Sequence, residues 1–205
     1  MAKLKGPLFS LGARGQIGKT LVYFGWKGLQ VVRTWVSPTN PRTAGQTTQR
    51  GHLTAAVDLI HTTMADDTDP LNEADRMAYA LLASTYPTPR TWFNQAVKDN
   101  VDQAVAGREM AIFHGAVLTP TDGQVEVDIK LELTGANAIT AGAIWYGTSP
   151  TALVHHVPTT GAELILGQNI TGLTNGVKYY FQYRATEHAD FLGARSGIYH
   201  ATPAA

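Results

Sequence analysis

Alternation of apolar and charged residues is clearest in the second half of the chain. In residues 124–133, QVEVDIKLEL, aliphatic residues fill every second position from Val125 onward, and charged residues lie between them. Side chains alternate between the two faces of a strand, so this segment predicts a strand with one buried face. The other strand candidates, separated by turn residues, are 141–147, 151–157, 163–170, 177–185 and 195–203. Short strands at this spacing predict an antiparallel β-sandwich.

A helical period of apolar residues precedes this region. A first helix is predicted over about residues 43–64. Asp69 with Pro70, and Thr88 with Pro89, combine an N-cap side chain with a proline in the first turn, so each pair predicts the start of a further helix. The stripes expected to face inward are Leu53, Val57, Ile60 and Met64, then Leu71, Ala74, Ala78 and Leu81, then Phe93, Ala96, Val97, Val101 and Ala104.

The segment before the helices predicts a β-hairpin. Residues 19–25, KTLVYFG, and 29–36, LQVVRTWV, are rich in β-branched and aromatic types, and the glycine of the intervening WKG favours a turn. Both faces of this hairpin are apolar, so it must pack against its own helices or another subunit. Residues 1–18 indicate a glycine-rich loop. We therefore expect an α+β domain over 1–111, with a hairpin and about three helices, followed by an all-β sandwich over 112–205.

Charge is distributed unevenly along a chain whose formal net charge is zero. Residues 1–50 contain eight Lys and Arg and no Asp or Glu, so residues 51–205 hold the other eight basic residues and all 16 acidic ones. A charge of +8 in the first part and −8 in the second can attract copies of the chain to one another. It can equally hold the basic part against nucleic acid or an acidic partner.

Composition argues against several classes of site. The chain has no cysteine, which removes disulfides, thiolate nucleophiles and cysteine zinc ligands. No apolar run approaches the roughly 18 residues of a membrane-spanning helix, and the N-terminus lacks the apolar region of a secretory signal. The seven histidines are scattered, and the adjacent His155 and His156 would point to opposite faces of a strand. We expect no membrane span, metal, cofactor or enzymatic activity.

The sequence ITGLTNGVKYYFQYRAT, residues 170–186, resembles the end of a fibronectin type III domain. In that family a leucine opens a turn, and a tyrosine six residues later begins the next-to-last strand. Leu173 and Tyr179 occupy these positions. Asn175 stands where a proline is common in the family, a small departure. The resemblance implies that Leu173 and Tyr179 belong to the core of the sandwich.

A second segment extends this resemblance toward the start of the same domain. AIWYGTSP, residues 143–150, resembles the third strand of the family, with Trp145 or Tyr146 as its core aromatic residue. The resemblance covers about residues 112–203. It implies a seven-stranded, immunoglobulin-like sandwich that serves as a binding or spacer module, although a fold alone does not fix function.

The N-terminal half carries a different resemblance. A glycine-rich segment, a W-K-G turn, V-V-R, and then N-P-R-T-x-x-Q-x-x-Q-R at a helix start are similar to structural proteins of bacteriophages and related bacterial gene clusters. The resemblance implies assembly into a virion-like particle, after synthesis in the host cytoplasm. The residues that carry this match are Trp26, Gly28, Arg33, Asn40, Pro41, Thr43, Gln46, Gln49 and Arg50.

The segment ARGQIGKT, residues 13–20, fits a relaxed phosphate-loop pattern. In such a loop Lys19 would contact phosphates and Thr20 a magnesium ion. A phosphate loop follows a buried strand and opens a helix, whereas the residues after Thr20 favour a strand. A nucleotide-binding enzyme is therefore a remote alternative, and a glycine-rich arm is the preferred interpretation.

Basic and aromatic residues around the hairpin form the candidate assembly interface. Arginine and tryptophan are enriched in protein interfaces, but they also bind nucleic acid through phosphate contacts and stacking. We favour contact with another subunit, because the same molecule supplies the matching acidic charge. The candidate residues are Lys19, Trp26, Lys27, Arg33, Trp35, Arg42 and Arg50.

These patterns favour a structural role over catalysis. We expect a bacteriophage virion protein of the tail, neck or head decoration, which forms homo-oligomers or binds other virion subunits through its basic arm and displays the sandwich. The alternative is a surface module that binds a host glycan or receptor through exposed aromatic residues such as Tyr180 or Tyr183.

Overall fold

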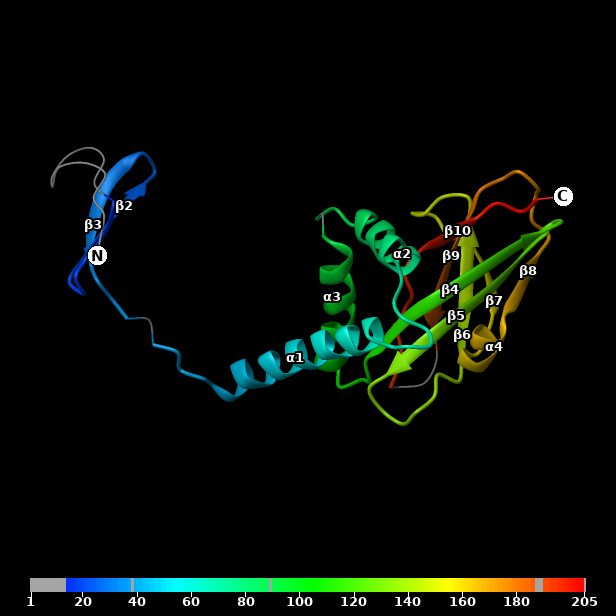
Figure 1. Ribbon diagram of the computed structural model, residues 1–205, viewed down its shortest axis with the longest axis horizontal. Helices are drawn as coiled ribbons and strands as arrows, with labels where there is room; N and C mark the ends of the chain where they lie inside the picture. The colour runs from blue at the N-terminus through cyan, green and yellow to red at the C-terminus, as the bar shows by residue number, and fades with distance from the viewer. Residues whose placement is uncertain (1–13, 38, 89, 187–189, 205) are drawn as a thin grey trace. The chain divides into compact units, whose positions relative to one another are not determined.

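Contacts between residues divide the chain into two compact units, Met1–Thr43 and Ala44–Ala205. The predicted boundary between residues 111 and 112 is wrong, because the helices contact the strands that follow them and belong to the same unit. Helices and antiparallel sheets are both present, so the fold is mixed α+β, with mainly strands toward the C-terminus (Figure 1). The computed structural model describes residues 14–37, 39–88, 90–186 and 190–204.

The N-terminal unit contains the strands β1 (Gly15–Ile17), β2 (Leu21–Trp26) and β3 (Leu29–Thr34). They form an antiparallel sheet in the order β1-β2-β3. Strands β2 and β3 confirm the predicted hairpin, and its two-residue turn is formed by Lys27 and Gly28, with φ of 47° and 83°. Turns with two positive φ angles match the twist of the flanking strands. Strand β1 corrects the prediction of a glycine-rich loop, because it pairs with β2 along its whole length.

Helices α1 (Ala44–Met64), α2 (Glu73–Ser84) and α3 (Trp92–Val105) confirm the three predicted helices. Their buried faces differ from the predicted stripes: in α1, Ile60 is fully buried, but Leu53 is half exposed. Leu53 lies in the first half of α1, where no residue from 44 to 55 is buried. In α2 and α3 the buried faces also include polar side chains, which a purely apolar period does not detect. The buried helix residues are Ala56, Leu59, Ile60 and Thr63 in α1, Asp75, Ala78, Tyr79, Leu82 and Ala83 in α2, and Gln95, Ala96, Val97, Asn100 and Gln103 in α3.

Capping side chains set the starts of α2 and α3. The Asn72 side chain accepts a hydrogen bond from the backbone N–H of Asp75 at 3.1 Å, and the Asp75 carboxylate accepts one from the backbone N–H of Asn72 at 2.9 Å. Thr91 caps α3 through its hydroxyl. The predicted caps at Asp69 and Thr88 are therefore wrong. A reciprocal capping box satisfies two helix-end donors at once, which explains why α2 begins at the later position.

The remainder of the second unit is mainly β-structure, as predicted. Its elements are β4 (Ala111–Thr121), β5 (Gln124–Leu133), β6 (Gly142–Gly147), β7 (His155–Pro158), the short helix α4 (Gly161–Leu166), β8 (Gln168–Thr171), β9 (Tyr179–Ala185) and β10 (Tyr199–Ala201). They build two antiparallel sheets, one in the order β4-β5-β8 and one in the order β10-β9-β6-β7 (Figure 1).

Two of these elements differ from the sequence prediction. Strand β4 is not predicted, because its first residues are apolar on both faces and therefore show no alternation. Residues 163–166, predicted to begin a strand, form the end of α4 instead. The reason is local: Thr160 and Glu163 form a reciprocal capping box, in which each side chain bonds the backbone N–H of the other.

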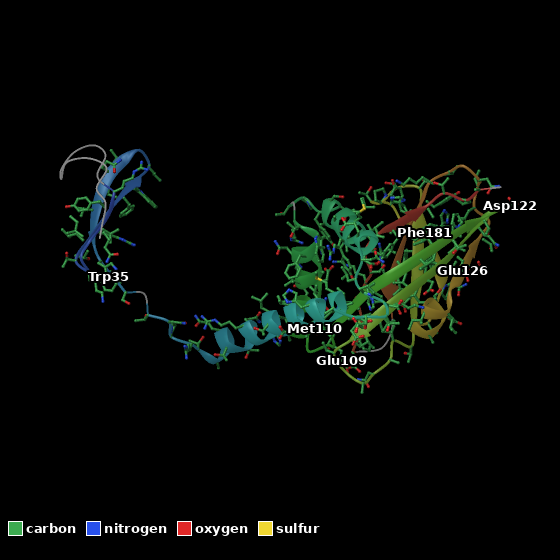
Figure 2. All side chains as sticks on the ribbon, in the orientation of Figure 1. Trp35, Glu109, Met110, Asp122, Glu126 and Phe181 are labelled. Atoms are coloured by element: carbon green, nitrogen blue, oxygen red, sulfur yellow. The ribbon has the colours of Figure 1, made fainter. Side chains whose placement is uncertain are left out.

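One hydrophobic core lies between the two sheets. Val125, Val127 and Ile129 of β5 are fully buried in it, as the alternation predicts. They share this core with Phe181 and Tyr183 of β9, which are also fully buried, and Figure 2 labels Phe181 within the strands. Both sheets therefore bury one face against the other.

The predicted core residues have different outcomes. Leu173 is buried in this core, and Tyr179 packs half-buried against it. Trp145 is not part of the core. Its neighbour Tyr146 packs inward, with its ring centroid 6.2 Å from that of Phe181. Adjacent residues of a strand point to opposite faces, so Trp145 lies on the outer face of β6.

A second core joins the helices to β4. Ile60 of α1 and Tyr79 of α2 pack with Met110 and Ile112, while Phe113 points into the core between the sheets. Strand β4 is therefore covered on both faces. The helices also contact β10, and β4 and β10 are edge strands of the two sheets. Covering two edges protects their backbone groups from pairing with other chains, and it is the physical reason why helices and sheets form one unit.

Asp75 links three elements of this unit. Its buried carboxylate accepts hydrogen bonds from the backbone N–H of Gly115 in β4 at 2.9 Å and from the hydroxyl of Tyr199 in β10 at 2.8 Å. Close packing supports the same junction, because a Cβ added to Gly197 would lie 2.7 Å from the Cβ of Ala78 in α2. A buried carboxylate needs such partners, so the fold specifies this position strictly.

Candidate assembly interface

Both faces of the N-terminal sheet carry apolar side chains. Residues paired directly across two antiparallel strands project to the same face, so the register of β2 and β3 defines both faces. The first face carries Val22, Phe24, Trp26, Leu29, Val31 and Arg33. The second face carries Leu21, Tyr23, Val32 and Thr34. Figure 2 shows side chains projecting from the sheet in both directions.

These side chains are not covered by the described chain. No residue from 14 to 37 that the structure describes is buried, and neither hydrophobic core includes any of them. Trp26, Leu29 and Val32 are 59%, 67% and 52% exposed. A sheet of this size is only marginally stable without cover, and contiguous exposed apolar surface marks interaction sites. The sheet therefore has the properties of one half of an interface.

Basic side chains border this apolar surface. Lys19 lies in the turn between β1 and β2, and Lys27 lies in the turn at the opposite end of β2. The guanidinium of Arg33 lies 5.4 Å from the centroid of the Phe24 ring, within the range of a cation–π contact. Residues 14–37 contain no Asp or Glu. The sheet thus presents uncompensated positive charge, which attracts an acidic partner.

Most of the predicted interface residues come together in this sheet. Trp35 directly follows β3, where its backbone N–H donates to the carbonyl of Thr20 at 2.7 Å, and Figure 2 labels it. Arg42 and Arg50 do not join the others, because Arg42 lies between β3 and α1, and Arg50 lies in α1 of the second unit. The predicted residues that the sheet brings together are Lys19, Trp26, Lys27, Arg33 and Trp35.

Leu29 and Val32 are interface candidates that the sequence reasoning missed. Selecting basic and aromatic residues by type leaves out aliphatic ones, although these two are among the most exposed in the sheet. The register places Leu29 directly opposite Trp26 and Val32 opposite Tyr23. The apolar character of both hairpin faces was the signal that could have found them.

The phosphate-loop pattern has a different local structure here. Lys19 and Thr20 lie in the turn that joins β1 to β2. The Thr20 hydroxyl donates to the backbone carbonyl of Ile17 at 2.8 Å. A phosphate loop leads into a helix, whose N-terminal N–H groups bind phosphate, whereas this turn leads into a strand. The segment therefore lacks the context in which that motif binds a nucleotide.

Histidines and long apolar helices provide no further site in the described chain. His155 and His156 point to opposite faces of β7, toward Tyr146 at 5.3 Å and Trp145 at 4.8 Å between ring centroids. Among the described residues, no group of three His, Asp or Glu side chains is arranged to hold a metal ion. Within those same ranges, no helix combines the length and the apolar character that crossing a bilayer requires.

Of the two tyrosines predicted for glycan recognition, only Tyr180 is partly exposed. Tyr183 is fully buried between the sheets. Tyr180 is half-buried against the helical core, and the Lys178 ammonium lies 5.4 Å from the centroid of its ring. An exposed aromatic platform at Tyr183 is therefore ruled out by its burial.

Comparisons with models of protein families, with curated protein sequences and with solved structures find no match to this chain. Its function is therefore inferred from its own geometry. The contrast between a sheet without buried residues and a unit with two cores is the main observation for that inference.

Proposed function

We propose that this protein is a structural subunit of a bacteriophage-type particle, and that it assembles through its N-terminal sheet. The observation that carries the proposal is the absence of any buried residue among those described from 14 to 37, in a sheet that is apolar on both faces. Burying a large apolar side chain contributes about 2 kcal/mol. Covering Trp26 and Leu29 alone would therefore contribute about 4 kcal/mol to association.

The proposed partner is the second unit of another copy of the chain. Residues 51–205 hold all 16 acidic residues, and Asp66, Asp67 and Glu73 are exposed. Hydrogen bonds from the backbone N–H groups of Asp69 and Thr68 lower the pKa of Asp66, so this carboxylate is charged at neutral pH. A basic surface on one copy that binds an acidic surface on the next makes a head-to-tail contact. Such contacts generate rings or filaments, the geometry of particle assembly.

The second unit is proposed to be fibronectin III-like. Two features support this finer assignment beyond the sequence resemblance. The sheet orders β4-β5-β8 and β10-β9-β6-β7 are those of a three-plus-four sandwich. The Tyr179 hydroxyl also accepts a hydrogen bond from the backbone N–H of Thr174 at 3.2 Å, like the tyrosine corner of immunoglobulin-like domains. In this proposal the unit is the displayed part of the subunit.

Sedimentation velocity at a series of concentrations tests the assembly role. The full chain is expected to associate as its concentration rises. The double variant Trp26→Ser with Leu29→Ser is expected to weaken this association at least tenfold, because it removes the most exposed apolar pair of the sheet. Electron microscopy of the concentrated wild-type chain would show whether the assemblies are rings or filaments.

A matched control uses exposed apolar residues of the second unit. Val154 and Leu166 are 67% and 82% exposed and lie outside α2 and the acidic segment before it, so Val154→Ser with Leu166→Ser removes comparable apolar surface from outside the sheet. This control is expected to associate as the wild type does. A wild-type chain that stays monomeric up to its solubility limit would contradict the proposal. Binding to duplex DNA that falls steeply with salt, without self-association, would instead assign the sheet to nucleic acid.

A further inference from the structure

The outer face of the β10-β9-β6-β7 sheet carries an unusual stack of side chains. The Trp145 ring in β6 lies between two groups from the neighbouring strands. The centroid of the His156 ring in β7 lies 4.8 Å away on one side, and the guanidinium carbon of Arg184 in β9 lies 5.1 Å from the Trp145 centroid. Strand β6 pairs with both β7 and β9, so the sheet itself fixes this order.

Three guanidinium groups gather beside this stack. Arg108, Arg184 and Arg195 line one hollow with a volume of about 510 Å³, here called the arginine hollow. Among the described residues, the ion pair at this hollow is that of Arg195 with the Asp99 carboxylate, at 2.6 Å. Arg108 donates to the backbone carbonyl of Leu192, and Arg184 donates its Nε–H to the Gln182 side chain at 2.8 Å. Its lining by described residues thus includes three arginines and no Asp or Glu.

Trp145 and Arg184 are each in an unfavourable environment at this site. The Trp145 Nε1–H is buried and has no acceptor within the described chain. Arg184 is partly withdrawn from water, and its burial, with the nearby charge of Arg195, lowers its pKa. A buried donor without an acceptor costs about 1–3 kcal/mol, and cations in close proximity repel each other. A ligand with anionic oxygens beside Arg184 would relieve the repulsion between the two cations.

A second hollow continues from the first along the sheet. Its volume is about 300 Å³, and Trp145 and Thr186 line both hollows. The remaining lining comes from Ala141, Gly142, Ala143, His156 and Pro158, and includes no Lys, Arg, Asp or Glu. The two hollows together therefore combine a cationic end with an uncharged one.

We propose that the two hollows together bind an organic oxyanion. Its carboxylate or phosphate group lies against Arg184 and Arg108 in the arginine hollow, and its uncharged body lies in the second hollow. Guanidinium groups bind both oxyanions through paired N–H donors, so the chemistry is shared between the two. Trp145 lines both hollows, so its indole N–H resonance reports on a ligand bound beside it. This site lies entirely within the second unit and does not depend on assembly through the N-terminal sheet.

Two-dimensional ¹H–¹⁵N NMR of the full chain tests this proposal through the Trp145 indole N–H. The Trp145→Phe variant assigns the resonance, and the probes are glucuronate, glucose 1-phosphate, glucose and inorganic phosphate. Glucuronate or glucose 1-phosphate is expected to shift the resonance saturably, and the stronger of the two identifies the oxyanion. Neutral glucose is expected to bind at least tenfold more weakly.

Arginine variants separate binding from a structural role. Arg184→Gln and Arg108→Gln are each expected to weaken binding at least tenfold. Arg76 provides a matched control, because its guanidinium lies 5.4 Å from the centroid of a different tryptophan ring, Trp92. Arg76→Gln should leave the affinity unchanged. If Arg184→Gln unfolds the chain, Arg108→Gln decides the question.

Three outcomes would overturn the proposal. The first is no saturable shift with either glucuronate or glucose 1-phosphate. The second is equal affinity for inorganic phosphate, glucuronate and glucose 1-phosphate, which would indicate an adventitious ion only. The third is unchanged binding in a folded Arg108→Gln variant.

Discussion

Strands β3 and β4 both carry apolar side chains on both faces, but only β4 is covered on both. Ile112 of β4 packs against the helices, and the adjacent Phe113 packs between the sheets. In β3, Leu29 and Val32 are mostly exposed. A strand with apolar side chains on both faces is therefore buried only where other elements of the chain pack against both of those faces.

This difference is the basis of the proposed function, in which the second unit is self-sufficient and the N-terminal sheet binds a partner. The second unit covers the edge strands β4 and β10 with its helices and satisfies its buried carboxylate with hydrogen bonds from its own chain. The N-terminal sheet has a defined register and turn, but no buried residue among those described. Local pairing thus specifies its shape, and in the proposed function an association supplies the stabilisation that burial provides.

The largest expected effect is the loss of the Asp75 carboxylate. Asp75→Ala leaves the hydroxyl of Tyr199 and the backbone N–H groups of Gly115 and Asn72 without their acceptor. Each buried donor left unpaired costs about 1–3 kcal/mol, so the free energy of unfolding of the second unit should fall by about 4 kcal/mol. Urea denaturation followed by circular dichroism would measure this loss.

The control for Asp75 is a neighbouring carboxylate on the surface of the same helix. The Glu73 side chain is 77% exposed and lies 3.7 Å from the Arg76 guanidinium. Glu73→Ala should change stability by less than about 0.5 kcal/mol, because exposed ion pairs contribute little. Equal losses for the two variants would contradict the role assigned to Asp75.

Alkaline pH is expected to weaken the second unit through its buried tyrosines. Burial raises the pKa of Tyr79, Tyr183 and Tyr199 in the folded chain. Their contribution is complete below the unfolded pKa of about 10 and is lost as pH rises toward the folded values. Together, the three tyrosines should lower the free energy of unfolding by about 3 kcal/mol between pH 9 and pH 11. Urea midpoints across this range would measure the slope.

Tyr183→Phe provides the comparison variant for this pH dependence. The Tyr183 hydroxyl is buried and has no hydrogen-bond partner in the described chain, so its removal should not destabilise the fold at neutral pH. The variant should lose about 1 kcal/mol less than the wild type by pH 11. If the free energy of unfolding of the wild type did not change up to pH 11, the raised pKa values of the buried tyrosines would be contradicted.

Close packing of α2 against the chain before β10 predicts a smaller effect. A Cβ added to Gly197 would lie 2.7 Å from the backbone carbon of Ala78, so Gly197→Ala should cost about 2–3 kcal/mol. Gly51 in α1 has open space around it, and Gly51→Ala should instead stabilise the helix by about 0.5–1 kcal/mol. Thermal denaturation of both variants would test the pair. A stabilising Gly197→Ala would show that this junction is not tightly packed.

The smallest expected effect is in the N-terminal sheet itself. Lys27 has a positive φ of 47°, which asparagine adopts more readily than lysine. Lys27→Asn should therefore stabilise the hairpin by about 0.5 kcal/mol, which corresponds to roughly twofold slower amide hydrogen exchange in β2 and β3. Lys19→Asn removes the same charge from the other turn, where φ is not positive, and should not slow exchange. If both variants slowed amide exchange equally, the effect would come from the lost positive charge and not from the backbone conformation at residue 27.

Local patterns alone predict several elements of this fold. The alternation over 124–133 predicts β5 and its buried face, and the helical period predicts α1 nearly to its ends. The WKG segment predicts the β2–β3 hairpin, because its glycine suits a two-residue turn. Most of the candidate interface follows from the same hairpin, since its two apolar faces are visible in the sequence.

Other features depend on contacts between distant residues, which a local pattern does not contain. Strand β4 shows no alternation because separate cores cover its two faces. Trp145 and Tyr146 are both aromatic, and only the pairing of β6 with β7 and β9 decides that Tyr146 faces the core. The buried role of Asp75 requires Tyr199, 124 positions further along the chain.

The sequence by itself thus determined the short-range elements and the concentration of positive charge near the N-terminus. Only the tertiary structure decided that the helices and sheets form one unit, and that the N-terminal sheet has no buried residue in the described chain. The physical reason is that the period of apolar residues shows which side chains favour burial. Which elements pack against them depends on contacts between residues far apart in the sequence.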